Sequence, residues 1–428
     1  MAMTQPAPVN SLMAAIADIG TDPVRGGYSR SVYSDPELNL REWFIAEAGA
    51  RGLEVETDRN GILWAWWDAP GAVSRENAVV TGSHMDSVPG GGAFDGPLGV
   101  ASALVAVDEL RSRQEQGVLT RRRALAVTVF PEEEGSRFGV ACLGSRLLTG
   151  AISAQKALSL KDPDGMTFGE IAATNGLNPQ QIGRDDTALA RIGHFVELHV
   201  EQGRGINTDE HTDATGAQPA VAVGSTILGH GRWRISVHGQ GNHAGTTLMT
   251  DRADPMVAAA EIILAVRQSA LEYDGARATV GRVQPVPGGT NVIASRVDLW
   301  LDVRHPQDEI TAAVVEKIHS RSTQIAAAAG CGAAMVEESY SGTVHFSPEL
   351  TRTLQNAVRR TAPAAPTLPT GAGHDAGVLA AHAPSGMIFV RNPTGISHAP
   401  EEHVENDDAA RGVTALTDAL AELLEAPA

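Results

Sequence analysis

Short, largely apolar segments alternate with longer segments of helical periodicity through the first half of this chain, and no other feature limits its fold so strongly. The strand-like segments are GILWAWWD (61–68), AVVTGS (78–83), ALAVTVF (124–130) and HFVELHV (194–200). The helix-like segments are NSLMAAIADIG (10–20), NLREWFIAEAGARG (39–52) and GVASALVAVDELRSRQEQG (99–117). Gly52 and Gly117 are expected to close the second and the third. Apolar strands in such an alternation are typical of a sheet covered by helices on both faces. We therefore expect an α/β sandwich.

A different order of elements occupies the middle of the chain. Residues 207–224 are rich in small and polar residues, which indicates a linker. After them we expect strand, helix, strand, strand, helix and strand, at 231–239, 254–272, 278–284, 295–305, 307–330 and 332–340. This is the order of a ferredoxin-like unit. Asp254 is the expected N-cap of its first helix, with Pro255 in the first turn.

The α/β pattern resumes after this unit, so the unit is expected to be an insertion. A helix, a strand and a final helix are predicted at 347–362, 386–392 and 407–426. The predicted domain organisation is therefore an α/β domain in two parts, 1–216 and 338–428, with an inserted domain at 217–337. At 428 residues the chain is also too long for one ordinary hydrophobic core.

Composition excludes several classes of protein. The net charge of −18 argues against binding to nucleic acid, which requires clustered Lys and Arg. No apolar run is long enough for a membrane span, and the N-terminal residues do not resemble a signal peptide. The 2 cysteines lie far apart in the sequence, which fits a reducing compartment rather than a disulfide scaffold. We expect a cytoplasmic protein with neither nucleic-acid nor membrane partners.

Histidines and acids follow the ends of four expected strands of the α/β part. They are His84, Asp86 and Asp95 after the second strand, Glu132, Glu133 and Glu134 after the third, His199 at the end of the fourth, and His398 after the strand at 386–392. In an open α/β sheet, ligands bind in the crevice outside the carboxyl ends of the strands. These side chains are therefore expected to lie together, on loops whose glycines allow tight folding.

The residue types in this cluster predict a metal site. Three adjacent acids would repel one another beside a buried strand unless a cation neutralised them. Imidazoles with carboxylates and no nearby thiolate suit Zn, Mn, Co or Ni. The candidates exceed the ligands of one tetrahedral ion, so a carboxylate that bridges two ions is expected. Asp86 could accept the second N–H of the His84 imidazole, although a turn-forming Asp is an equal alternative.

Eight motifs in the chain jointly resemble one family. They are GSHMDSVPGGGAFDGPLGV, PEEEGSRFG, ELHVEQG, GNHAGTT, PGGTNVI, LDVRH, GAGHDA and GISHAPEE, which span about residues 80–405 in order. Together they look like the amidohydrolase branch of the M20 metallopeptidase clan, which comprises N-carbamoyl-L-amino acid hydrolases, β-ureidopropionases and allantoate amidohydrolases. The resemblance implies an aminopeptidase-like catalytic domain with two metal ions, and an inserted lid domain that mediates dimerisation.

The resemblance also implies roles for the metal-ligand candidates. His84 and His199 would belong to different metal ions, and Asp95 would bridge the two ions. Glu134 and His398 would complete the two sites. The residues alone leave open which of the three adjacent glutamates binds metal and which acts as the base. The resemblance implies that Glu133 is the general base, and it implies no role for Glu132.

Further residues are implied to contact the substrate. Asn291 and Arg304 would hold its carboxylate, for which a polar donor and a planar guanidinium are suited. His243 would reach the active site of a partner subunit and stabilise the oxyanion. Gln202 and the backbone of Gly373 would contact the ureido or carboxylate end. Taken singly, each residue also has a structural alternative: His243 as a surface histidine, Asn291 as a turn residue and Arg304 as a solvated arginine.

The reaction implied is metal-assisted hydrolysis of a ureido amide bond. Glu133 would take a proton from the attacking water and return it to the leaving nitrogen, with Asp86 as a supporting residue. An N-carbamoyl-L-amino acid would give the free amino acid, ammonia and carbon dioxide. Allantoate and N-carbamoyl-β-alanine remain alternative substrates, and an aminoacylase or dipeptidase of the same clan is a more distant alternative.

Overall fold

The computed structural model describes residues 8–69, 71, 74–212 and 217–426. The chain divides into two compact units. Unit 2 runs from Thr226 to Val344, and unit 1 comprises the chain on both sides of it. These limits lie a few residues C-terminal to the expected boundaries at 217 and 337.

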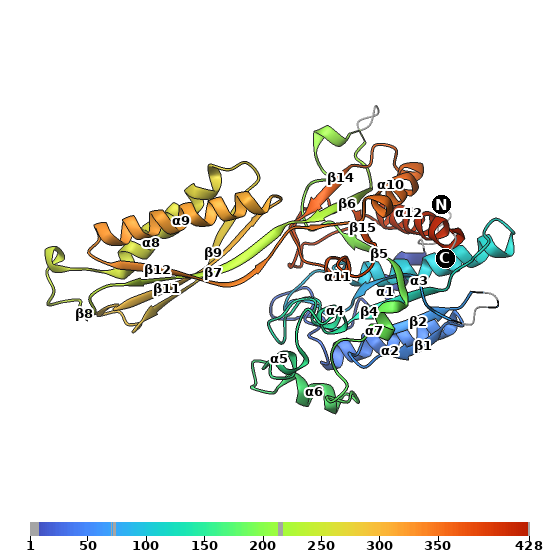
Figure 1. Cartoon of the computed structure of the whole chain (residues 1–428), viewed down its shortest axis with the longest axis horizontal. Helices are drawn as coiled ribbons and strands as arrows, with labels where there is room; N and C mark the ends of the chain where they lie inside the picture. The colour runs from blue at the N-terminus through green and yellow to red at the C-terminus, as the bar shows by residue number, and fades with distance from the viewer. Residues whose placement is uncertain (1–7, 70, 72–73, 213–216, 427–428) are drawn as a thin grey trace. The chain divides into compact units, whose positions relative to one another are not determined.

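The larger sheet has four parallel strands at its centre (Figure 1). Its order is β1 (Glu54–Thr57), β2 (Leu63–Trp67), β4 (Leu125–Phe130), β3 (Ala78–His84), β5 (Ile192–Val200), β15 (Ser385–Val390), β6 (Val221–Ile227) and β13 (Val344–His345), with β14 (Thr367–Thr370) paired to β6. Every residue of β3, β4 and β15 is buried, as the apolar runs predicted. The predicted mixed α/β class is confirmed.

Five helices contribute to the main core of unit 1 with the central strands. They are α1 (Pro8–Ala15), α2 (Asp35–Ala50), α3 (Pro97–Glu115), α10 (Pro348–Thr361) and α12 (Asn406–Glu425). The other helices described in this unit are α4 (Leu143–Thr149), α5 (Ala154–Leu158), α6 (Phe168–Thr174), α7 (Asp186–Ala190), α11 (Asp375–Leu379) and the 3-10 turn η1 (Asp209–His211). None of the helices in the described residues combines the length and apolar character needed to cross a bilayer.

Glycines close the two helices where the sequence predicted them. Gly52 follows α2 with a φ of 62°, and Gly117 follows α3 with a φ of 72°. This left-handed conformation ends a helix and is favourable for glycine because glycine has no Cβ. The helix predicted at 10–20 is shorter, because α1 ends at Ala15.

Unit 2 has the order of a ferredoxin-like sheet. Its antiparallel strands are β12 (Gly332–Ser341), β7 (Gly229–His238), β11 (Arg296–His305) and β9 (Arg277–Val286). The other elements are α8 (Pro255–Leu271), α9 (Asp308–Ala328), the turn η2 (Met249–Asp251), and a small ladder of β8 (Asn242–His243) and β10 (Val292–Ile293). Both helices share a core with the sheet. Asp254 caps α8 as predicted, because its side chain accepts the N–H of Met256 at 2.9 Å.

The prediction of a linker at 207–224 is partly wrong. Residues 213–216 lie outside the described residues, but Val221–Ile227 forms β6, which pairs antiparallel with β15. Val221, Ala222 and Val223 are almost completely buried. The small side chains that suggested a linker instead fit a strand packed in the core, so tertiary pairing outweighs local composition here.

Candidate metal centre

The parallel strands deliver the expected side chains to one edge of the sheet. His84 is the last residue of β3, and His199 is the next-to-last residue of β5. Glu133 follows β4 closely, and His398 lies in the loop after β15. Because β4, β3, β5 and β15 run in the same direction, their carboxyl ends meet at this edge.

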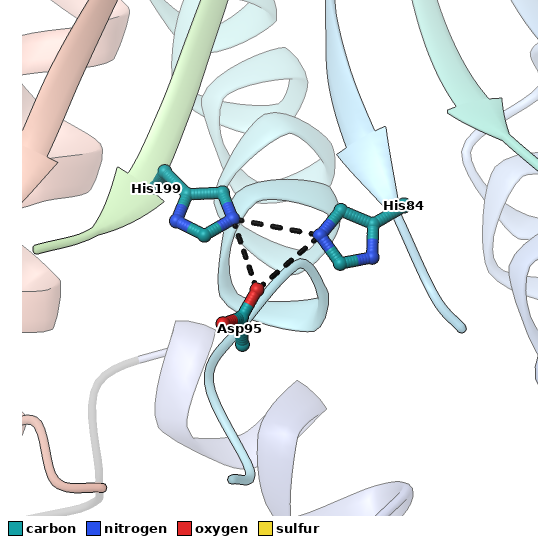
Figure 2. Close-up of side chains that lie close together, drawn as sticks. All are labelled: His84, Asp95 and His199. Carbon is teal, nitrogen blue, oxygen red and sulfur yellow. Dashed lines mark hydrogen bonds and ion pairs between the residues drawn. The ribbon is translucent and has the colours of Figure 1, made fainter. Parts of the chain in front are cut away.

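His84, Asp95 and His199 form one group of converging side chains (Figure 2). Asp95 Oδ1 lies 3.4 Å from His84 Nε2 and 3.3 Å from His199 Nε2. The two Nε2 atoms are 3.5 Å apart, so the three atoms form a small triangle. The exposed fractions are 0% for both histidines and 4% for Asp95. Two imidazole nitrogens and a carboxylate oxygen are common ligands of zinc and related ions.

Backbone carbonyls fix which nitrogen of each imidazole faces this group. His84 Nδ1 lies 3.0 Å from the carbonyl O of Asp86, and His199 Nδ1 lies 2.9 Å from the carbonyl O of Val200. A carbonyl oxygen can only accept, so each Nδ1 carries the hydrogen and each Nε2 keeps a free lone pair. This outer contact is the usual way in which a protein orients a metal-binding histidine. Both Nε2 atoms are therefore ready to bind a cation.

A second group forms on the other oxygen of Asp95. His398 Nε2 lies 3.6 Å from Asp95 Oδ2 and 3.3 Å from Glu134 Oε2. Gln202 Nε2 donates to the same Asp95 oxygen at 2.7 Å and lies 3.3 Å from His398 Nε2. Asp95 thus faces one group with each carboxylate oxygen, which is the arrangement that a bridging carboxylate requires.

The expected division of the histidines is wrong. The resemblance implied that His84 and His199 belong to different ions, but both imidazoles lie on Oδ1 of Asp95 and in one group. The physical reason is that β3 and β5 are adjacent parallel strands, which places His84 and His199 side by side. His398, which comes from the loop after β15, lies on the other side of the carboxylate with Glu134.

Asp86 supports the glutamate loop through its carboxylate. Its Oδ1 lies 3.7 Å from His84 Nδ1, farther than its own carbonyl O at 3.0 Å. The two carboxylate oxygens accept the backbone N–H groups of Glu133 and Glu134, each at 3.2 Å. Asp86 therefore accepts the imidazole N–H with its backbone carbonyl, whereas its carboxylate holds the glutamate loop.

Burial and close charges shift the pKa values at this site. Burial alone would raise the pKa of Asp95, but the imidazoles of His199 and His84 outweigh it and hold this pKa well below its usual range. Burial raises the pKa of Glu133 well above its usual range, against the opposing charge of His84. Burial and then the charge of Asp95 raise the pKa of Glu134. Buried acids that repel one another are stabilised by a divalent cation, so this donor set fits a metal centre.

Two further features hold the loop that carries Asp95. Glu402 Oε1 accepts the backbone N–H groups of Phe94 at 2.9 Å and Asp95 at 3.0 Å. Gly96 has a φ of 86°, and a Cβ at this position would lie 2.6 Å from Nδ1 of His84. Glu402 was not predicted as a site residue, although it belongs to the motif GISHAPEE. Gly96 confirms that a glycine is needed where this loop folds against the imidazole.

Two further buried side chains at the site were not predicted from the sequence. Glu197 lies on β5, and its Oε1 accepts the hydroxyl of Ser83 at 2.7 Å. The ring of His374 lies edge-on to His199 with centroids 4.6 Å apart, and neither ring nitrogen has a hydrogen-bond partner in the described part of the chain. Glu197, His199 and His374 form a third group of potential ligands. Two features of the sequence could have indicated them. Glu197 is an acid within an apolar strand, and His374 directly follows Gly373 in the motif GAGHDA.

The other expected substrate residues lie in unit 2, at opposite ends of its sheet. His243 is in β8, and the N–H of Ala244 donates to the carbonyl O of Asn291 at 3.0 Å, so these two residues are neighbours. β11 begins at Arg296, shortly after β10, and Arg304 lies near its other end, roughly 25 Å away along the strand. Asn291 and Arg304 of one chain therefore do not hold the same small carboxylate, contrary to the expectation.

Comparison with known proteins decides the family. Residues 80–422 match the sequence profile of peptidase family M20/M25/M40. The chain belongs to this family. The resemblance inferred from the motifs is therefore confirmed.

Relatives within the family cover almost the whole chain. It is 34% identical over 392 residues to the N-carbamoyl-L-amino-acid amidohydrolase of Paenarthrobacter aurescens, with 90% of each protein covered. It is 30% identical over 403 residues to the allantoate amidohydrolase of Bacillus subtilis, with 93% of each protein covered. A solved amidase of the hydantoinase/carbamoylase family from Burkholderia multivorans matches with a TM-score of 0.83 at 30% identity, covering 98% of both chains.

Proposed function

We propose that this family member hydrolyses the ureido C–N bond of N-carbamoyl-L-amino acids and releases the L-amino acid, ammonia and carbon dioxide. One observation carries the proposal: Asp95 shares its two oxygens between two groups of metal-ligand candidates, next to the buried Glu133. The names of relatives at 34% and 32% identity support the same substrate class.

Two divalent ions of the Zn, Mn, Co or Ni type would occupy the two groups. One would be held by His84, Asp95 and His199, and the other by Asp95, Glu134 and His398. Bound there, such ions would polarise the ureido carbonyl and make a water more acidic.

Glu133 would act as the general base. It follows β4, is 5% exposed, and its Oε2 lies 3.7 Å from His84 Nε2. Its carboxylate therefore lies beside the first group while Glu134, its neighbour, belongs to the second. We propose that Glu133 takes the proton of the attacking water and returns it to the leaving nitrogen.

Arg304 would bind the substrate carboxylate. Its guanidinium is at present engaged by Asp302, with Nε to Oδ1 at 2.7 Å and Nη2 to Oδ2 at 3.0 Å. This pair shows that the guanidinium presents two parallel N–H groups to a carboxylate. Gln202 and the backbone of Gly373 would contact the other end of the substrate. A Cβ at Gly373 would meet no atom within 4 Å, so space is open beside it.

His243 would act in the active site of a partner in a homodimer and stabilise the oxyanion. Since Asn291 adjoins His243 and lies far from Arg304 in the same chain, Asn291 would act with His243 across the interface. Mixing Glu133→Gln and His243→Ala proteins tests this arrangement. Mixed dimers would regain activity, because one of their two sites has both residues; no recovery after subunit exchange would exclude action across the interface.

The experiment for the reaction compares four substrates with metal-reconstituted protein. Ammonia release is measured with N-carbamoyl-L-methionine, N-carbamoyl-β-alanine and allantoate, and free methionine is measured with N-acetyl-L-methionine. Turnover of the carbamoyl-L-amino acid that is lost in Glu133→Ala supports the proposal. Preference for allantoate would favour the second candidate, for which the 30% identity to the B. subtilis enzyme argues. Turnover of the acetyl substrate alone would exclude both. A cytoplasmic location stays a prediction.

A further inference from the structure

A buried thiol contacts the carboxylate that we assign as the base. Cys142 Sγ lies 3.3 Å from Glu133 Oε1, and the exposed fractions are 2% for Cys142 and 5% for Glu133. In the described residues, no other side chain forms a hydrogen bond with the Glu133 carboxylate. Cys142 lies outside the eight family motifs, and the chain has only one other cysteine, Cys331.

The backbone around Cys142 is fixed against the same loop. The N–H groups of Cys142, Leu143 and Gly144 donate to the carbonyl O atoms of Glu133, Glu132 and Pro131, at 2.7, 3.0 and 3.1 Å respectively. The first N–H groups of α4 thus find their partners in the loop after β4. Any residue except proline could supply these backbone bonds, so the contribution of the cysteine side chain is the contact with the carboxylate.

Cys142 is held in a conformation that is unfavourable for its side chain. Its φ of 55° and ψ of 37° are left-handed, a region that non-glycine residues rarely adopt. Strain of this kind persists only where the surrounding structure determines it, and it is frequent at active sites. Glu132 and His398 in the neighbouring loops share this feature, with φ values of 54° and 57°.

The thiol keeps its hydrogen at this position. Burial, and then the charges of Glu133 and Asp375, raise the pKa of Cys142 well above its usual range. A protonated thiol is a hydrogen-bond donor and a poor nucleophile or metal ligand. The S–H of Cys142 therefore donates to the carboxylate of Glu133.

We propose that Cys142 is a positioning residue, whose S–H donates to Oε1 of Glu133 and so directs Oε2 toward the metal-ligand group at His84. The 3.7 Å distance from Oε2 to His84 Nε2 supports this orientation. The carboxylate has several rotamers, and a fixed donor on one oxygen selects one of them. The proposal rests on the proposed role of Glu133 as the base.

The first test compares Cys142→Ala and Cys142→Ser with Cys331→Ala as the matched cysteine control. All three residues at position 142 have a Cβ, so the left-handed backbone strain is the same. We expect Cys142→Ala to lower kcat about tenfold or more with KM within about twofold, because misdirection of a base acts on the chemical step. Serine restores a donor, so Cys142→Ser should retain most of kcat. Unchanged kcat in Cys142→Ala, or equal losses in Ala and Ser, would overturn the proposal.

A second test does not depend on activity. A double-mutant cycle of Cys142→Ala and Glu133→Ala is measured by urea unfolding of the metal-free protein; alanine is used at position 133 because a glutamine oxygen would still accept the S–H. If the two side chains interact, the effects on the unfolding equilibrium constant should depart from additivity by about threefold or more. Additive effects would show that the contact does not exist. If the wild-type protein hydrolyses no ureido substrate, the proposed function fails while the cycle still decides the contact.

Discussion

Glu402 accepts the backbone N–H of Asp95 at 3.0 Å, although the two residues are 307 positions apart in the sequence. The same oxygen accepts the N–H of Phe94, and the other oxygen accepts the hydroxyl of Ser397 at 3.0 Å. Glu402 thereby joins the loop before α3 to the loop that carries His398. Glu402 is 5% exposed, so its carboxylate makes these contacts in place of contacts with solvent.

We predict that Glu402→Ala weakens metal binding although Glu402 is not among the ligand candidates. Loss of the carboxylate frees the loop of Asp95, and outer contacts of this kind typically change metal affinity about 10–100-fold. Competition titration with a chromogenic chelator measures the affinity. The neighbouring Glu401 is exposed, so Glu401→Ala is the control and should bind metal normally. Equal affinity in both variants would show that Glu402 does not support the site.

Gly96→Ala is predicted to disturb the site more than the same change at Gly117. Both glycines have positive φ values, 86° and 72°, so alanine costs about 1–2 kcal/mol of backbone strain at either position. At Gly96 the new Cβ would also lie 2.6 Å from His84, whereas at Gly117 it meets no atom within 4 Å. Chemical unfolding and metal titration of the two variants should show an additional loss only for Gly96→Ala. Similar losses would mean that the strain alone accounts for the effect.

The elements that could be predicted from sequence are those with a strong local pattern. The buried strands β3, β4, β5 and β15 were predicted because each is a short apolar run between helical segments. β6 was missed, since Val221, Ala222 and Val223 are small residues in a polar context and become a strand only by pairing with β15. Short helices such as α5 and α7 also lack enough periods to be recognised.

The same limit applies to the site. His84, His199 and His398 were predicted because they follow strand ends, where parallel topology brings side chains together. The pairing of His84 with His199 on one oxygen of Asp95 was not predicted, because it depends on strand order, and β5 neighbours β3 only in space. Glu402 contacts a backbone N–H 307 positions away, and Cys142 contacts a glutamate in the segment just before it; no sequence pattern marks either contact.

Asp95 and His398 are predicted to affect metal stoichiometry differently. Asp95 belongs to both groups, so Asp95→Asn should reduce binding at both, whereas His398→Ala removes a donor from the second group alone. Elemental analysis after dialysis should show less than about one retained ion for Asp95→Asn and about one for His398→Ala. His403, an exposed histidine of the same segment, provides the control variant His403→Ala. Equal stoichiometry in Asp95→Asn and His398→Ala would exclude a shared carboxylate.

Asp375 is predicted to make the metal-free protein less stable as the pH rises. Its carboxyl is fully buried beside Glu197, and Oδ2 has no hydrogen-bond partner in the described residues. Burial and then the charge of Glu197 raise its pKa from 3.8 to about 8. Between these values the folded chain keeps the proton and the unfolded chain has lost it, so rising pH favours unfolding. One such proton contributes a slope of about 1.4 kcal/mol per pH unit.

Asp375→Asn removes this ionisation while it keeps the oxygen that accepts the Ser145 hydroxyl. The variant should therefore lose less stability than the wild type between pH 5 and pH 8, by about 1 kcal/mol or more per pH unit. Urea unfolding in the presence of a chelator, at several pH values, measures the two slopes. Asp407 is exposed at the start of α12, so Asp407→Asn should keep the slope of the wild type. Parallel slopes for wild type and Asp375→Asn would mean that Asp375 is ionised in the folded protein throughout this range.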